Sequence, residues 1–118
     1  MAVRCVIVDD SERFRASARR LLTTQGMAVV ADAADSRQAL RAIDEHDPDV
    51  VLVDVGLGAE SGLDLAAQIA PRPVIVVSSL APDDVEELVG RTGALGFVSK
   101  SQLSALTITS LLRRLPET

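Results

Sequence analysis

The stretch VRCVIVDD, residues 3–10, is a short and nearly continuous apolar run that ends in two aspartates. Four similar runs, rich in valine and isoleucine, follow at residues 28–31, 50–53, 74–77 and 95–98. Runs of this length and composition are typical of strands that are buried on both faces of a sheet. The sequence therefore predicts five such strands.

The segments between these runs carry helical patterns. The first segment has one apolar stripe with helical spacing, formed by Phe14, Ala18, Leu21 and Leu22. Gly26 is expected to stop this first helix. In the second segment, Asp35 with Gln38 three residues later resembles a capping box, which marks the start of a helix.

Three further helices are expected toward the C-terminus. Residues 61–70 predict a short third helix that is closed by Pro71 and Pro73. Pro82, followed by two acids, predicts the start of a fourth helix, because proline and negative charge both favour the first turn. The last helix is expected over about residues 101–115.

The alternation of strands and helices predicts an α/β fold, in which helices cover both faces of a parallel sheet. We expect a five-stranded parallel sheet of order 2-1-3-4-5 with right-handed crossovers, which is the flavodoxin-like, doubly wound, three-layer arrangement. The sequence contains no internal repeat, linker or low-complexity segment, so residues 1–118 are expected to form one domain.

The composition excludes several classes of protein. The net charge is −5 and the basic residues are scattered, so we expect no direct contact with nucleic acid. No apolar run approaches the roughly 20 residues of a membrane helix, and two acids follow the first run too early for a signal peptide. Cys5 is the only cysteine, so a disulfide within the chain is impossible and a cytoplasmic location is expected.

Polar side chains stand where four of the expected strands end. They are Asp9 and Asp10 after the first run, Asp54 after the third, Ser78 after the fourth, and Lys100, the only lysine, after the fifth. Taken singly, an aspartate after a strand is more often a helix cap and a serine a turn residue. Capping requires no cluster, however, and the carboxyl ends of these neighbouring strands meet at one edge of the sheet, where ligands bind.

Three carboxylates held close together need a compensating charge. At about 4 Å and an effective dielectric constant near 20, one pair of like charges costs on the order of 4 kcal/mol. A divalent cation removes that cost, and oxygen ligands at an open edge favour Mg²⁺. His46 is the only histidine and is expected at a solvated helix end, so the sequence offers no histidine–cysteine cluster for zinc.

Asp54 is the central candidate for chemistry at this edge. A carboxylate can act as a nucleophile and form an aspartyl phosphate. Lys100 would give positive charge to one phosphoryl oxygen, and the Ser78 hydroxyl would donate a hydrogen bond to another.

In their order and spacing these residues resemble the receiver domains of bacterial response regulators, and the resemblance covers the whole chain. The residues that match are Asp9, Asp10, Asp54, Gly62 eight residues after it, Ser78 and Lys100. A residue other than proline after Lys100 is similar to the subgroup that is linked to helix-turn-helix output domains.

The resemblance implies a role for each residue of the acidic cluster. Asp10, Asp54 and the backbone carbonyl of Gly56 would bind Mg²⁺, with Asp9 acting largely through water. Asp54 would accept a phosphoryl group from a sensor histidine kinase. The chain would be a phosphorylation-dependent switch and no enzyme beyond its own phosphorylation and dephosphorylation.

The resemblance also implies how the switch is read. Ser78 would move toward the phosphoryl group, and Phe97 would be the aromatic switch residue, for which plain core packing is the alternative. The state would be relayed through the fourth helix, the fifth strand and the last helix, to an output domain or to a separate effector protein.

The last helix carries more apolar residues than one narrow stripe. These residues are Leu103, Ala105, Leu106, Ile108, Leu111, Leu112 and Leu115. They predict either a broad core face or a contact with a second copy of the chain or another partner.

The sequence departs from the family pattern in four places. Gly58 replaces a common proline, Ser78 stands where threonine is frequent, and the interval between Asp54 and Ser78 is short. Ser101 follows Lys100 where many members have proline, so no cis bond is assumed there.

Small residues flank the acceptor. Gly56 and Ser79 leave room for water beside Asp54, so we expect a short-lived acyl phosphate.

Three other functions are compatible with parts of the sequence. A small phosphatase with an aspartate nucleophile would require an acidic residue two positions after that nucleophile, whereas here Ser11 follows the adjacent pair Asp9 and Asp10. A nucleotide-binding module is suggested only by a weak glycine pattern after the third run. A receiver-like scaffold that binds a partner without phosphorylation is the main alternative.

Overall fold

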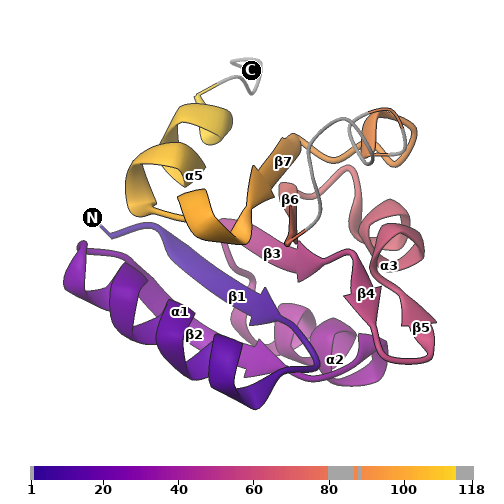
Figure 1. Ribbon diagram of the computed structural model, residues 1–118, viewed down its shortest axis with the longest axis horizontal. Helices are drawn as coiled ribbons and strands as arrows, with labels where there is room; N and C mark the ends of the chain where they lie inside the picture. Colours follow the sequence, from indigo (N-terminus) through magenta and orange to yellow (C-terminus); the bar gives the residue numbers. More distant parts are fainter. Residues whose placement is uncertain (1, 80–86, 88, 114–118) are drawn as a thin grey trace.

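Five parallel strands form the central sheet (Figure 1). The computed structural model describes residues 2–79, 87 and 89–113. The strands are β1 (Arg4–Val8), β2 (Ala28–Ala33), β3 (Val50–Asp54), β6 (Val74–Ser78) and β7 (Gly96–Ser99), in the order β2-β1-β3-β6-β7. Because β6 and β7 are the fourth and fifth expected strands, the predicted order 2-1-3-4-5 is confirmed.

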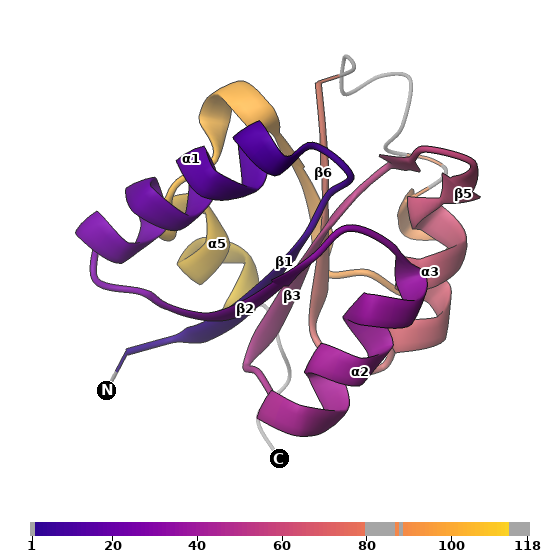
Figure 2. The same ribbon diagram turned by 90° about the horizontal axis from the view of Figure 1, so that it is seen from below.

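Helices cover both faces of this sheet, as Figure 2 shows from below. α1 (Glu12–Thr24) and α5 (Ala105–Leu112) lie on one face, and α2 (Ser36–His46) and α3 (Gly62–Ile69) lie on the other. The predicted three-layer α/β arrangement is therefore confirmed. Pro82, the predicted start of the fourth helix, lies outside the described residues.

The strands are buried on both faces because their apolar side chains alternate between two core clusters. In β1, Cys5 and Ile7 belong to the cluster that contains buried residues of α1 and α5, whereas Val6 and Val8 belong to the cluster of α2 and α3. Burying one such valine or isoleucine contributes about 1.5–3 kcal/mol. The sheet is therefore held rigidly, and the residues at its carboxyl edge take fixed positions.

Side-chain caps set where the first two helices begin. The Ser11 hydroxyl accepts a hydrogen bond from the Phe14 backbone at 3.2 Å, and Asp35 accepts one from Gln38 at 2.9 Å. The Gln38 side chain accepts in turn from the Ala34 backbone at 2.9 Å. The predicted cap at Asp35 is confirmed, although Gln38 reaches the residue before the cap.

The predicted ends of α1 and α3 also agree with the structure. Gly26, directly after the C-cap of α1, has a φ of 96°, which glycine adopts at little cost. α3 lies inside the predicted range 61–70.

The prediction for the last helix was wrong at its start. Instead of a helix from residue 101, the chain forms a 3-10 turn, η1 (Lys100–Gln102), and α5 begins only at Ala105. The reason is a capping box at Ser104 and Thr107, in which each side chain bonds the other residue's backbone N–H at 3.1 Å. The Lys100–Ser101 peptide bond is trans, since Ala70–Pro71 is the one cis bond among the described residues.

The hairpin of β4 (Gly56–Leu57) and β5 (Glu60–Ser61) is absent from the sequence predictions. Its two-residue loop needs a left-handed first position, which Gly58 supplies with a φ of 63°. The hairpin returns the chain to Gly62, where a Cβ atom would lie 1.7 Å from the carbonyl oxygen of Asp54. Gly62 is therefore required by close backbone contact beside the acceptor strand.

Most apolar residues of α5 serve the core. Ile108 and Leu111 are buried, and Ala105 and Leu112 pack against the same cluster. Leu106 differs, because it is 72% exposed. The broad core face accounts for the helix except at Leu106, and Leu115 lies outside the described residues.

Candidate functional site

The predicted site residues stand at the carboxyl edge of the sheet. Asp9 follows β1 directly, Asp54 and Ser78 are the last residues of β3 and β6, and Lys100 follows β7. These strands are neighbours in the sheet, so their carboxyl ends lie side by side (Figure 1). The topology thus brings together groups that are up to 91 residues apart in the chain (100 minus 9).

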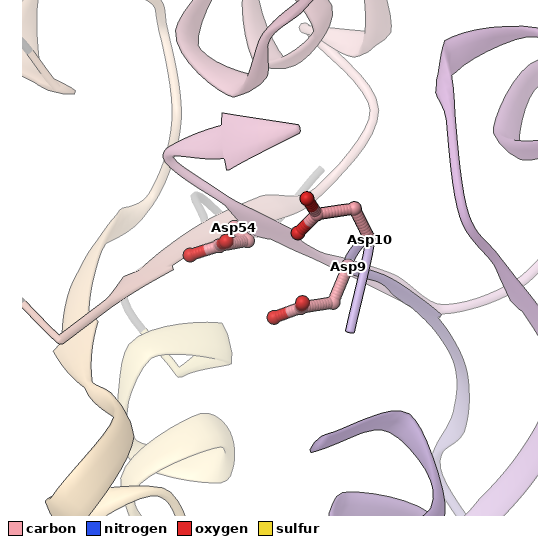
Figure 3. A group of neighbouring side chains, drawn as sticks. All are labelled: Asp9, Asp10 and Asp54. Atoms are coloured by element: carbon pink, nitrogen blue, oxygen red, sulfur yellow. The ribbon is translucent and has the colours of Figure 1, made fainter. Parts of the chain in front are cut away.

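Three carboxylates form the centre of this edge (Figure 3). One oxygen each of Asp9, Asp10 and Asp54 lies within 4.8 Å of the other two. Asp9 is fully buried, Asp54 is half-buried, and Asp10 is exposed. The sequence prediction that these three side chains share one place is confirmed.

The Lys100 ammonium lies between two of the carboxylates. Its Nζ is 2.8 Å from Asp9 Oδ2 and 3.8 Å from Asp54 Oδ1. The Lys100 side chain is only 24% exposed. One positive charge therefore faces three carboxylates, and the cluster has a net charge of about −2 when all four groups are ionised.

This imbalance changes the acidity of the central carboxyl. The pKa of Asp54 is raised from 3.8 to about 6, first by burial, then by the charge of Asp9 and, to a smaller extent, that of Asp10, while Lys100 and the Val55 backbone N–H oppose the rise. Asp54 is then mostly ionised at pH 7 and more basic than an ordinary aspartate.

Asp9 is fixed by the turn that leads into α1. Its Oδ1 accepts the Ser11 backbone N–H at 2.8 Å, and its carbonyl oxygen accepts Arg15 Nη1 at 2.6 Å. Arg15 also lies 3.8 Å from Asp32 on β2. Arg15 is absent from the residues predicted from the sequence. Its position one helical turn after the cap residue Ser11 was the available signal.

The carboxylate cluster suits a hard divalent cation. All its donors are oxygens, which Mg²⁺ prefers. Asp9 Oδ2 is buried and accepts no hydrogen bond of good geometry from the described residues, although the Lys100 ammonium is close. A buried oxygen that accepts no well-formed hydrogen bond and lies beside two further carboxylates fits the predicted ion.

The other predicted residues lie nearby in different settings. Ser78 is buried and pairs in register with Ser99 of β7. Gly56 in β4 and Ser79 after β6 are both exposed. Phe97 is half-buried on β7 and packs against the cluster of α2 and α3. This packing is compatible with a plain core residue, so the role of Phe97 as a switch stays a prediction.

A comparison with protein families decides the assignment. The family model of the response regulator receiver domain matches residues 5–111. The chain belongs to this family. Receiver domains of this family act in phosphorylation-based two-component signalling. This general function therefore applies to the present chain.

Individual relatives agree with the assignment. A protein-glutamate methylesterase/protein-glutamine glutaminase of Oleidesulfovibrio alaskensis is 36% identical over 112 residues, which cover 90% of this chain and 30% of that protein. The transcriptional regulatory protein PdtaR of Mycobacterium tuberculosis is 28% identical over 100 residues, which cover 82% of this chain and 49% of that protein. The receiver thus spans about a third to a half of these relatives.

Solved structures share the fold. The response regulator domain of Thermotoga maritima CheB has a TM-score of 0.84 at 27% identity, with 98% of this chain and 100% of that chain covered. The receiver domain of NarL from Mycobacterium tuberculosis has a TM-score of 0.77 at 29% identity and covers 95% of this chain and 91% of its own. Among the described residues, no helix is long and apolar enough to cross a membrane.

Proposed function

We propose that Asp54 of this receiver accepts a phosphoryl group from a sensor histidine kinase in a reaction that requires Mg²⁺. The observation that carries the proposal is the cluster itself, in which the oxygens of Asp9, Asp10 and Asp54 lie within 4.8 Å of one another and Lys100 is 3.8 Å from Asp54. A phosphoryl acceptor needs a nucleophilic carboxylate and positive charge on both sides of it.

The proposed chemistry is a transfer between two nucleophiles. An oxygen of ionised Asp54 attacks the phosphorus of a phosphohistidine, and a P–O bond forms while the P–N bond breaks. The electron pair of that bond leaves with the imidazole, which takes a proton from solvent. Water later cleaves the acyl phosphate, releases inorganic phosphate and restores the carboxylate.

Each remaining residue has a proposed part in holding the reacting groups. Asp10, Asp54 and the Gly56 carbonyl would hold Mg²⁺, with Asp9 acting largely through water. The ion would neutralise charge on the phosphoryl oxygens. Lys100 would pair with one phosphoryl oxygen, and the buried Ser78 hydroxyl would donate a hydrogen bond to another.

Intact-mass measurement tests this proposal. The wild-type chain, incubated with a small phosphodonor and Mg²⁺, should gain the mass of one phosphoryl group. The gain should be absent without Mg²⁺ and in Asp54→Asn. A wild-type mass that does not change would favour the alternative function, a scaffold that binds its partner without phosphorylation.

The relay of the signal is also a proposal. The Ser78 hydroxyl would move toward the new phosphoryl group, and Phe97 would follow it and alter the face made by β7 and α5. A groove of about 320 Å³ between these two elements, lined in part by Phe97, Leu106 and Leu111, supports this face as the region that changes. An output domain or a separate effector would bind there.

Self-association through α5 stays a prediction. Leu112 packs against the core, so substituting it would confuse unfolding with loss of contact. Leu106 is the better test position because it is 72% exposed. Leu106→Glu should abolish any dimer without loss of stability, and an unchanged dimer in that variant would contradict the prediction.

The lifetime of the phosphorylated state is expected to be short. Gly56 and Ser79 are both exposed, which supports access of water to Asp54. Bulky side chains at both positions should lengthen the half-life of the acyl phosphate. A half-life that stays the same would contradict this proposal.

The extent and location of the domain are proposals of the same kind. We infer one receiver domain over residues 1–118, a proposal supported by the family match over residues 5–111. Limited proteolysis should then leave a single stable core.

The proposed cytoplasmic location rests on the presence of a single cysteine, Cys5. Burial raises the pKa of the Cys5 thiol to about 11, so this thiol is poorly reactive.

A further inference from the structure

An aromatic ring takes part in the charge cluster at the carboxyl edge. The ring centroid of Phe14 lies 4.2 Å from Lys100 Nζ. The sequence pattern placed Phe14 only in the apolar stripe of the first helix. The structure adds a cation–π contact between the first turn of α1 and the residue that follows β7.

The position of the ring is set by the turn that also holds Asp9. Asp9 Oδ1 accepts the Ser11 backbone N–H at 2.8 Å, and the Ser11 hydroxyl accepts the Phe14 backbone N–H at 3.2 Å. Two consecutive hydrogen bonds therefore tie the backbone of Phe14 to a carboxylate of the cluster. Phe14 is half-buried and packs against the core cluster of α1 and α5.

The ammonium of Lys100 has three neighbours of the favourable sign. They are Asp9 Oδ2 at 2.8 Å, Asp54 Oδ1 at 3.8 Å and the face of the Phe14 ring at 4.2 Å. A lysine side chain has a long flexible stem and loses rotamer entropy when it is held. The negative face of the Phe14 ring attracts the Lys100 ammonium and thereby favours the side-chain conformation in which it is held.

We propose that Phe14 is a positioning residue for phosphotransfer, because its ring holds the Lys100 ammonium in the gap between Asp9 and Asp54. Phe14 acts through Lys100 and does not touch the reacting atoms. The inference rests on the proposed function of Asp54 as the acceptor. It adds a residue that the acidic cluster alone does not contain.

The composition of the chain allows a direct spectroscopic test. Lys100 is the only lysine, and the two phenylalanines, Phe14 and Phe97, are the only Phe, Trp or Tyr residues. Lysine-selective isotope labelling therefore yields the NMR signals of one residue. We expect the Lys100 Hε protons of the unphosphorylated wild type to be shifted upfield by the ring current, and Phe14→Leu to return them to the random-coil position. Phe97→Leu, the matched control, should leave them shifted.

The kinetic test follows phosphorylation by a small phosphodonor with Mg²⁺. Phe14→Leu keeps apolar bulk and removes the ring, and it should slow phosphorylation about fivefold, which corresponds to about 1 kcal/mol at 1.4 kcal/mol per factor of ten. Phe14→Tyr restores a ring and should keep both the rate within about twofold and the NMR shift.

The outcomes separate this inference from the proposed function. Rates that are equal in wild type and Phe14→Leu, or a Phe14→Tyr variant as slow as Phe14→Leu, would overturn the positioning role. Lys100 signals that Phe14→Leu leaves unchanged would overturn the contact itself. A wild type that takes no phosphoryl group, with the Lys100 shift still dependent on Phe14, would refute Asp54 as the acceptor and leave the contact standing.

Discussion

The two ends of strands β1, β3 and β6 differ in their balance of positive and negative charge. At the amino ends of β1, β3 and β6 stand two acids and two arginines. They are Asp47, Asp49, Arg4 and Arg72. At the carboxyl ends of these strands and of β7, three carboxylates share the Lys100 ammonium. The charges at the amino end are balanced, whereas the carboxyl end has about two excess negative charges.

The hydrogen bonds differ in the same way. At the amino end, Asp49 accepts the Arg4 backbone N–H at 2.8 Å, the Arg4 guanidinium donates to the Asp47 carbonyl at 3.1 Å, and Arg72 pairs with the Asp47 carboxylate. At the carboxyl end, a buried oxygen of Asp9 accepts no well-formed hydrogen bond from the described residues. The difference teaches that the amino end stabilises the fold, whereas the carboxyl end has the unbalanced charge that the proposed binding of a cation and a phosphoryl group would require.

The largest effect is expected when the single ammonium is removed. Lys100→Met should lower the free energy of unfolding at pH 7 by about 3 kcal/mol, because Asp9 would be left as a buried carboxylate without its charge partner. Urea denaturation measures it. A loss below about 1 kcal/mol would mean that Lys100 does not compensate the burial of Asp9.

Neutralising the acceptor should have the opposite sign. Asp54→Asn should raise the free energy of unfolding at pH 7 by about 2 kcal/mol, since ionising a carboxyl whose pKa is raised from 3.8 to about 6 costs the folded state stability. The folded protein holds this proton more tightly than the unfolded chain, so the contribution of Asp54 is fully present below pH 3.8 and is lost as the pH rises through about 6.

The pH dependence provides the control for this prediction. The advantage of Asp54→Asn over wild type should disappear as the pH falls below about 4, where the wild-type carboxyl is protonated in both states. Unfolding curves at several pH values measure the difference. A stabilisation that is the same at pH 4 and pH 7 would contradict the electrostatic explanation.

A smaller loss is expected from an aspartate at the balanced end. Asp49→Ala should lower the free energy of unfolding by about 1 kcal/mol, because the Arg4 backbone N–H loses its acceptor. Urea denaturation under the same conditions allows the change in the free energy of unfolding to be compared with that of Asp54→Asn. A gain in stability would show that the amino end is as strained by charge as the carboxyl end.

The smallest effect is expected at the exposed ion pair. Arg72→Ala should change the free energy of unfolding by less than about 1 kcal/mol, since Asp47 is 84% exposed and the pair is screened by solvent. Repeating the measurement in high salt should remove most of the change. A loss as large as that of Lys100→Met would erase the distinction between the two ends.

The strands and their ends could be predicted because both depend on local sequence. Five apolar runs predicted the five strands of the sheet. Because neighbouring parallel strands end at a common edge, the sequence also predicted that Asp9, Asp54 and Lys100 lie close together. Burial on both faces leaves few alternatives for such runs. The cluster therefore followed from topology together with residue type.

Other features depend on contacts that no local pattern encodes. The start of α5 at Ala105 was decided by the Ser104–Thr107 capping box, in competition with the apolar pattern from residue 101. The ring of Phe14 was expected only in the core, because helical spacing gives a face and not the identity of a neighbour 86 residues away (100 minus 14). The distinction between core Leu112 and exposed Leu106 likewise needs the packed structure.

A Mg²⁺ titration followed by unfolding tests the central claim most directly, namely that among the described residues the carboxyl edge of the sheet has unbalanced negative charge and the amino edge does not. Mg²⁺ should raise the free energy of unfolding of the wild type and of Asp49→Ala equally, by about 2.7 kcal/mol at one hundred times its dissociation constant, and should raise that of Asp54→Asn much less. Equal stabilisation of all three proteins, or none in the wild type, would contradict the account.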